Sequence, residues 1–155
     1  MARIAWEVAP DVQARLVRLV EALGFAHVDP ARLVALRSTG SKARFLARIW
    51  PLDRVWQLAL GVAPHYVIEV KHERFDRLTR AQQDRVLIHE LLHIPRTFSG
   101  AVLPHRHAGG RIDERAVDVH DRRWRALQAE AVAATPPPVP AGASAAPPPE
   151  GHSWS

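Results

Sequence analysis

The chain has 155 residues, 21 basic and 16 acidic side chains, a net charge of +5, nine histidines and no cysteine. This length fits one domain, and the lack of cysteine excludes disulfides, cysteine-ligated metal sites and thiol catalysis. No apolar run is long enough to cross a membrane and the N-terminal segment does not resemble a signal peptide, so we expect a cytoplasmic protein without membrane contact.

The composition changes at residue 135. The segment 135–155 is rich in proline and alanine, has one charged residue, Glu150, and shows no apolar periodicity. Such a segment lacks the apolar side chains that would offset the entropy lost on ordering, so it predicts a disordered tail. The preceding residues, 1–134, are numerous enough to bury a core and form the predicted folded domain.

The first half of the chain predicts a helix followed by short elements. Apolar side chains recur at helical spacing over residues 11–23, and Gly24 is placed to end that helix. Residues 33–36 form a short apolar run that favours a strand. Pro51 and the apolar residues after it favour a short helix with proline near its first position. We expect three tryptophans to belong to the core, namely Trp50, Trp56 and Trp124.

Strand-forming side chains fill residues 65–71. Glu69 interrupts the apolar run, which indicates one accessible position in the strand. If this strand lies at a sheet edge beside the site described below, it could hold an extended peptide by strand addition, with Glu69 or Lys71 exposed. An ordinary half-buried strand explains the same pattern equally well.

Residues 80–94 predict the most informative helix. Thr79 and Gln82 have the spacing of a capping box, and Pro95 disfavours helix at the residue before it. The second half of this helix is apolar on nearly every side, which is typical of a buried helix. A final helix is expected from a cap at Asp113 to about residue 133.

The buried helix contains the pattern His-Glu-x-x-His at residues 89–93. His89 and His93 are about one helical turn apart and project from the same face, so both imidazoles can reach one Zn²⁺ ion at about 2.0–2.1 Å. Glu90 lies about 100° around the helix, near enough to act as general base on a zinc-activated water. Two core histidines with protein partners are the alternative, but burying two histidines and a glutamate without a shared role is costly.

A catalytic zinc ion normally takes a third protein ligand. His105 follows His93 by twelve residues, across a loop rich in turn residues, and is the first candidate. Glu114 is the main rival, because Glu114 and Asp118 are spaced on the final helix as in thermolysin-like enzymes, where a helical glutamate is the third ligand. The remaining alternatives are two other histidines, His107 and His120.

The stretch from residue 44 to residue 105 resembles the family called Putative phage metallopeptidase, found in phages and prophages. The resemblance is carried by Ala47-Arg48-Ile49, Tyr66-Val67-Ile68-Glu69-Val70, Phe75-Asp76-Arg77-Leu78 and, above all, the block from His89 to Gly100 followed by His105. It implies a zincin-like α+β domain, in which a short twisted sheet packs against the His-Glu-x-x-His helix, with N- and C-terminal helices. It also implies a metallopeptidase, and it favours His105 as third ligand because a histidine follows Phe-Ser-Gly at this spacing in the family.

We therefore expect a zinc metallopeptidase that hydrolyses peptide bonds of a peptide or protein substrate, with His89, His93 and His105 on Zn²⁺ and Glu90 as general base. The alternative is a non-catalytic phage accessory module that uses zinc for structure and binds DNA or protein. Nucleic acid is considered because of the net charge and a basic cluster, although a solvated face explains such a cluster more simply. The cluster consists of Arg37, Lys42, Arg44 and Arg48.

Overall fold

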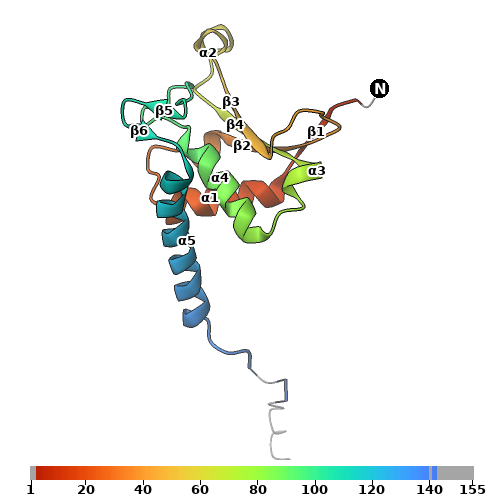
Figure 1. The fold of residues 1–155 in the computed structure, drawn as a ribbon, viewed down its shortest axis with the longest axis vertical. Helices are drawn as coiled ribbons and strands as arrows, with labels where there is room; N and C mark the ends of the chain where they lie inside the picture. The colour runs from red at the N-terminus through yellow and green to blue at the C-terminus, as the bar shows by residue number, and fades with distance from the viewer. Residues whose placement is uncertain (1–2, 140, 143–155) are drawn as a thin grey trace, which may run out of the picture.

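The computed structural model describes residues 3–139, 141 and 142. A four-stranded mixed sheet lies against helices in an α+β arrangement, as the sequence predicts (Figure 1). The strands are β1 (Ala5–Val8), β2 (Leu33–Thr39), β3 (Ala47–Pro51) and β4 (Tyr66–Lys71), in the order β1-β2-β4-β3. The central strands β2 and β4 are parallel, and each edge strand is antiparallel to its neighbour.

The described residues also form five α-helices and a small hairpin. The helices are α1 (Pro10–Ala22), α2 (Arg54–Leu60), α3 (His72–Phe75), α4 (Arg80–Leu92) and α5 (Glu114–Ala134). A short 3-10 helix, η1 (Pro30–Arg32), precedes β2, and β5 (Arg106–His107) pairs with β6 (Gly110–Arg111). The three long helices α1, α4 and α5 confirm the predicted helices to within two residues at each end.

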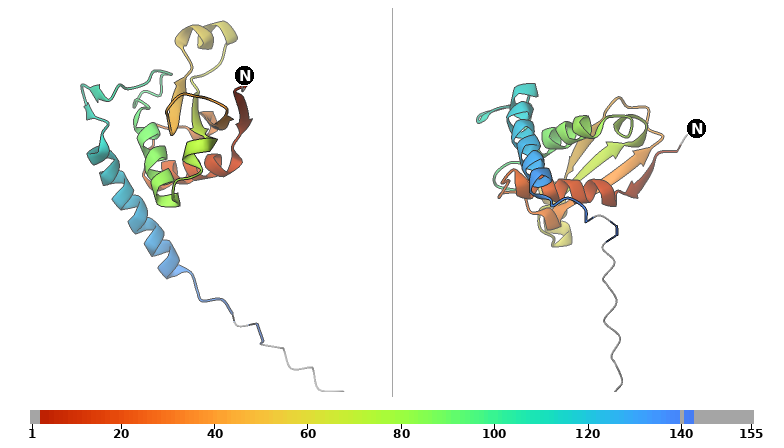
Figure 2. Two further views of the ribbon diagram at one scale, coloured as in Figure 1. Left: turned by 45° about the vertical axis from the view of Figure 1, so that its right-hand side comes forward. Right: turned by 90° about the horizontal axis from the view of Figure 1, so that it is seen from below.

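Helix α5 extends away from the body of the molecule and ends at Ala134 (Figures 1 and 2). The predicted disordered tail, 135–155, lies largely outside the described residues. Its described members, residues 135–139, 141 and 142, form no helix or strand. The division of the chain into a domain and a disordered tail therefore stays a prediction.

One face of the sheet and the inner sides of α1 and α4 form the core. Side chains alternate along a strand, so Leu33 and Ala35 of β2 share a face with Tyr66 and Ile68 of β4. These four side chains are at most 2 % exposed and pack with apolar residues of the two helices, including Leu16, Leu19, Leu87, Ile88 and Leu91. Each such burial contributes about 1.5–3 kcal/mol, so the core holds α4 firmly on the sheet.

A buried polar contact joins the three long helices. Asp84 of α4, 3 % exposed, pairs with Arg15 of α1 and accepts a hydrogen bond from the indole N–H of Trp124 of α5 at 3.0 Å. Arg15 also donates to Gln83 Oε1 at 2.6 Å and to the carbonyl oxygen of Arg80 at 3.2 Å. Because both charges are buried, each depends on the other for compensation.

The expectation of an accessible Glu69 is wrong, and of the two alternatives for residues 65–71 the edge strand is wrong. β4 lies between β2 and β3, and Glu69 and Lys71 are only 0 and 6 % exposed. The Glu69 carboxylate accepts hydrogen bonds from three side chains on the sheet face away from the helices: Ser38 Oγ at 2.6 Å, Trp50 Nε1 at 2.8 Å and Arg48 Nε at 3.0 Å. The charged residue within this apolar run is therefore a buried carboxylate with hydrogen-bond partners, and it does not mark a position exposed to solvent.

Pro51 does not begin a helix, and two of the three tryptophans lie outside the core. Pro51 ends the edge strand β3, where a residue without an amide N–H is tolerated, and α2 begins three residues later. Trp50 and Trp56 are 43 and 56 % exposed, because Trp50 faces the helix-free side of the sheet and α2 has no buried residue. Trp124 is partly buried against the core.

Replacing Asp84 with alanine should destabilise the fold strongly, because the substitution leaves the Arg15 guanidinium buried without its partner. We expect Asp84→Ala to lower the free energy of unfolding by about 3–5 kcal/mol, measured by urea denaturation. Glu114→Ala is the matched control, since that carboxylate is 86 % exposed in its pair with Arg85 and should contribute less than about 1 kcal/mol. Equal losses in the two variants would contradict the structural role of Asp84.

Candidate metal centre

Helix α4 begins at a capping box and carries two histidines towards its C-terminal end. The amide N–H of Gln82 donates to Thr79 Oγ1 at 3.2 Å, and the amide N–H of Thr79 donates to Gln82 Oε1 at 3.0 Å, as predicted. The helix ends at Leu92, with His93 as its C-cap. His89 is half-buried and His93 is buried, so both imidazoles are held by their surroundings on one side of the helix end.

The structure brings His105 to the same place. Nε2 of His89 lies 3.3 Å from Nε2 of His93 and 3.3 Å from Nε2 of His105. One ring nitrogen from each of the three residues lies within 4.8 Å of the others, so the three imidazoles could hold one metal ion. Two ligands bound tetrahedrally at about 2.0–2.1 Å are about 3.3–3.4 Å apart, and the observed spacing therefore fits such an ion.

The surroundings of His89 and His93 favour the neutral form of both imidazoles. Nδ1 of His93 donates to the carbonyl oxygen of Leu103 at 2.5 Å, which leaves Nε2 as the free acceptor. Burial lowers the pKa of His89, and the neighbouring rings of His93 and His105 lower it further. Burial also lowers the pKa of His93, against the opposing effect of the hydrogen bond to Leu103. Neutral imidazole is the form that binds a metal ion.

A tight turn after α4 leads the chain to His105. The hydroxyl of Tyr66, on β4, accepts a hydrogen bond from the amide N–H of Gly100 at 2.9 Å and donates one to the carbonyl oxygen of Ala101 at 2.7 Å. Phe98, at φ 46°, packs edge-on against Tyr66 with ring centroids 5.0 Å apart. Gly100 has φ 90°, and a Cβ there would lie 2.5 Å from the carbonyl oxygen of Leu52. Glycine at position 100 is thus a backbone requirement of the turn.

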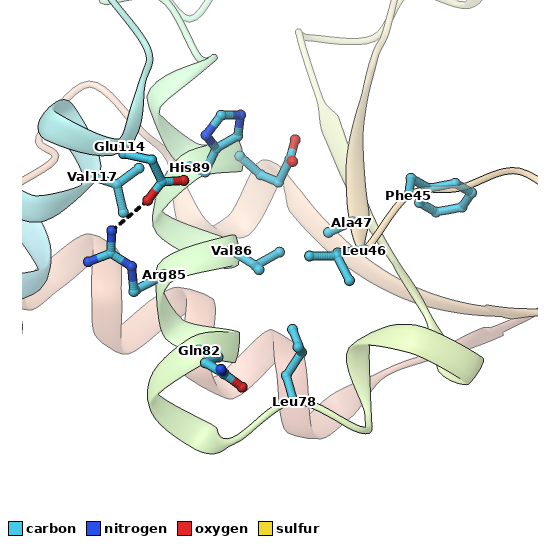
Figure 3. Close-up of a pocket in the computed structure, with 11 residues that line it drawn as sticks. Phe45, Leu46, Ala47, Leu78, Gln82, Arg85, Val86, His89, Glu114 and Val117 are labelled. Carbon is cyan, nitrogen blue, oxygen red and sulfur yellow. Dashed lines mark hydrogen bonds and ion pairs between the residues drawn. The ribbon is translucent and has the colours of Figure 1, made fainter.

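A cavity of about 460 Å³ lies beside His89, and Glu90 belongs to its lining. Figure 3 labels the other residues that line it. His89 belongs to the same wall, and the rest of the lining is mainly apolar, with Phe45, Leu46, Ala47, Leu78, Val86 and Val117. Glu90 is 8 % exposed, and burial raises its pKa to about 8. Among the described residues, no positive charge or hydrogen bond opposes that shift. A buried carboxyl group beside a metal-binding triad is typical of a proton-transfer group.

The structure does not bring the other candidate ligands into the triad. Glu114 is exposed and pairs with Arg85 at 2.8 Å. His107 accepts a backbone N–H hydrogen bond at 3.2 Å within the β5–β6 hairpin. The ring of His120 packs edge-on against Phe25 at a centroid distance of 5.1 Å. Of the proposed third ligands, His105 alone lies within reach of His89 and His93 in the described part of the chain.

Reasoning from the sequence missed the side of α4 that lines the cavity. Gln82, Arg85, Val86 and His89 recur at intervals of three and four residues and share this wall (Figure 3). That spacing is the signal that could have found it. Arg85 also closes the rim towards α5 by pairing with three acidic side chains there, Glu114, Asp118 and Asp121.

Comparison with known proteins supports the resemblance. A family model described as Putative phage metallopeptidase matches residues 4–134. This match confirms the similarity inferred from the motifs and extends it over α1 and α5. Comparison with curated proteins and with solved structures gave no match. Within the described residues, no helix combines the length and apolar character needed to span a membrane.

Glu90 should make the stability of the metal-free protein depend on pH. Its pKa is about 8 in the folded chain and about 4.5 when unperturbed, so its protonated form contributes stability that is fully present below about pH 4.5 and lost as the pH rises through about 8. As the pH rises, we therefore expect the unfolding free energy of wild type to fall relative to that of Glu90→Gln, because the amide does not titrate. Urea denaturation of both metal-free proteins from about pH 5 to about pH 9 measures it. A constant difference would contradict the raised pKa.

Proposed function

The chain belongs to the Putative phage metallopeptidase family, and from this premise we propose that it is a zinc-dependent peptidase that hydrolyses peptide bonds. One observation carries the proposal, namely the convergence of the imidazoles of His89, His93 and His105 beside the buried carboxyl group of Glu90. Three protein ligands with an open fourth position are typical of catalytic zinc sites, whereas structural zinc sites are closed by four protein ligands.

The donor set supports zinc as the ion. Imidazole suits several transition metals, and the 3.3 Å from Nε2 of His89 to Nε2 of His93 and of His105 suits an ion that accepts tetrahedral geometry, as zinc does. The hydrogen bond from His93 to the Leu103 carbonyl would hold that ring in one orientation whether or not the ion is bound.

In the proposed reaction, Glu90 moves the proton. The bound zinc ion would polarise the scissile carbonyl and lower the pKa of a water molecule towards about 7. The positive charge of the bound ion would favour the ionised form of Glu90. A carboxylate oxygen of Glu90 would then accept the proton that this water loses on attack and donate it to the nitrogen of the leaving group. Because Glu90 is only 8 % exposed, bulk water has little access to the proton while Glu90 holds it.

We place the peptide substrate along β3. This strand is the sheet edge nearer α4, and its first residue, Ala47, lines the cavity together with His89 and Glu90. An extended peptide can add to such an edge through main-chain hydrogen bonds, while the cavity receives one of its side chains. β4 cannot serve in this way because it is paired on both sides.

The alternative of a zinc-stabilised module that binds DNA has less support. In the basic cluster, Arg37 pairs with two acidic side chains at 2.8 and 3.1 Å, and Arg48 pairs with the buried carboxylate of Glu69 at 3.0 Å. These two arginines are therefore already compensated and are poorly placed to bind phosphates. A buried Glu90 beside the triad would also have no part in a purely structural zinc site.

Metal content tests the ligands directly. After Zn²⁺ is supplied, we expect the purified protein to hold about one zinc ion per chain, measured by mass spectrometry. His93→Ala and His105→Ala should lose the ion, because two imidazoles bind it too weakly. His107→Ala is the matched control for His105→Ala and should retain it, as should Glu114→Ala. Loss of zinc in Glu114→Ala with retention in His105→Ala would move the third ligand to α5.

Hydrolysis tests the role of Glu90. The Glu90→Gln variant should cleave unfolded casein about 10²–10⁴-fold more slowly than wild type, since an amide cannot accept the proton of the attacking water. Its zinc content should be unchanged. Glu130→Gln is the matched control, because it makes the same substitution at an exposed carboxylate of α5 that does not line the cavity. Activity of Glu90→Gln equal to that of wild type would rule out the general-base role.

A further inference from the structure

Helix α2 exposes an apolar surface that no described part of the chain covers. Four of its seven residues form this surface, which we call the α2 patch: Val55 (68 % exposed), Trp56 (56 %), Leu58 (72 %) and Leu60 (61 %). The helix projects from the end of the molecule opposite the far end of α5 (Figures 1 and 2). Exposed apolar side chains gathered on one helix are typical of a site of interaction.

The apolar side chains of α2 are turned outward while a polar side chain anchors the helix. At 3.6 residues per turn, the α2 patch covers roughly 200° of the helix circumference. Gln57 lies on the remaining side, and its Nε2 donates to the carbonyl oxygens of Leu52 at 2.8 Å and Ser99 at 3.0 Å. A helix that stabilises its own domain buries its apolar stripe, so this reversed arrangement points to an external partner.

The α2 helix is fastened to the turn that leads to the metal centre. The bond from Gln57 to Ser99 lies beside Gly100, where a Cβ would come within 2.2 Å of Gln57 Nε2. The same turn is held by Tyr66 and continues to Leu103, whose carbonyl oxygen accepts from His93. The patch is therefore fixed relative to the triad through a short chain of contacts.

The α2 patch also lies where a bound peptide would go. Helix α2 starts three residues after β3 ends, so a chain that extends along the free edge of β3 reaches α2 at that end of the strand. At the other end of β3, Ala47 belongs to the apolar cavity beside Glu90. Both ends of this path present apolar surface.

We propose that the α2 patch binds an apolar stretch of the polypeptide substrate, so that the protein selects extended chains rich in apolar side chains. The inference rests on the proposed peptidase function. Charge favours a polypeptide over a membrane, because residues 53–62 contain only one acidic and one basic side chain, Asp53 and Arg54. A membrane-binding helix normally carries a basic polar face that attracts anionic lipid, and α2 has none.

The test measures binding without hydrolysis. Full-length Glu90→Gln protein loaded with Zn²⁺ is titrated with a fluorescein-labelled extended peptide containing Leu, Phe and Val, and with a counterpart in which these are replaced by Ser and Asn. Fluorescence anisotropy gives Kd. Trp56→Ala and Leu58→Ser are each added to Glu90→Gln. Trp6→Ala is the matched control, because Trp6 is 52 % exposed on β1, at the opposite edge of the sheet.

We expect the apolar peptide to bind at least about tenfold more tightly than its polar counterpart, with Trp56→Ala and Leu58→Ser weakening its binding about tenfold and Trp6→Ala changing it less than about twofold. Equal Kd values for Trp56→Ala and Trp6→Ala would overturn the proposal. Two further results would overturn it if Trp56→Ala leaves the peptide Kd unchanged. One is a dimer in sedimentation that Trp56→Ala dissociates, and the other is binding to phosphatidylserine vesicles that Trp56→Ala abolishes.

The same variants separate this inference from the peptidase proposal. If wild type hydrolyses no peptide while Glu90→Gln shows Trp56-dependent binding of the apolar peptide, the peptidase function fails and the α2 patch stands as a polypeptide-binding surface. If wild type hydrolyses the apolar and polar peptides equally well, and Trp56→Ala does not alter either rate, the peptidase stands and the assignment of the α2 patch fails.

Discussion

The arrangement of the three long helices depends on the contacts of the buried Asp84 carboxylate. It sits on α4 and joins that helix to α1 through Arg15 and to α5 through Trp124. Apolar packing alone fixes a helix on a sheet but specifies its rotation weakly, whereas a buried ion pair is costly unless its geometry is met. The rotation of α4 decides which residues face the cavity. In the observed rotation His89 and Glu90 both line the cavity.

The second requirement is a rigid path from α4 to the third imidazole. Tyr66 on the central strand β4 holds the turn at Gly100, and the chain then passes Leu103, which orients His93, before it reaches His105. The central strand thus positions two of the three rings without contributing a ligand. The same turn holds α2 through Gln57, so the exposed apolar surface and the candidate metal centre share one support.

Local patterns predict much of this structure. The capping box of Thr79 and Gln82, the four-residue spacing of His89 and His93, and the cap at Asp113 act over one helical turn and appear as predicted. Properties that depend on distant partners could not be predicted. The sequence predicts an accessible Glu69, because its partners Ser38, Trp50 and Arg48 lie on other strands or far along the chain. The sequence also predicts that Trp56 is a core residue, but α2 has no buried residue. The position of His105 after His93 and the family resemblance both favour it over Glu114, but the turn that brings it to α4 has no periodic signal and could not be predicted.

We propose that the imidazoles of His89, His93 and His105 form a zinc site with one open position. Zinc X-ray absorption spectroscopy on the zinc-loaded protein tests it most directly, since imidazole rings give a recognisable multiple-scattering pattern. We expect three imidazole nitrogens at about 2.0–2.1 Å from the zinc ion and one oxygen ligand from solvent. A spectrum that fits only two imidazoles, or four protein ligands with no solvent oxygen, would contradict it.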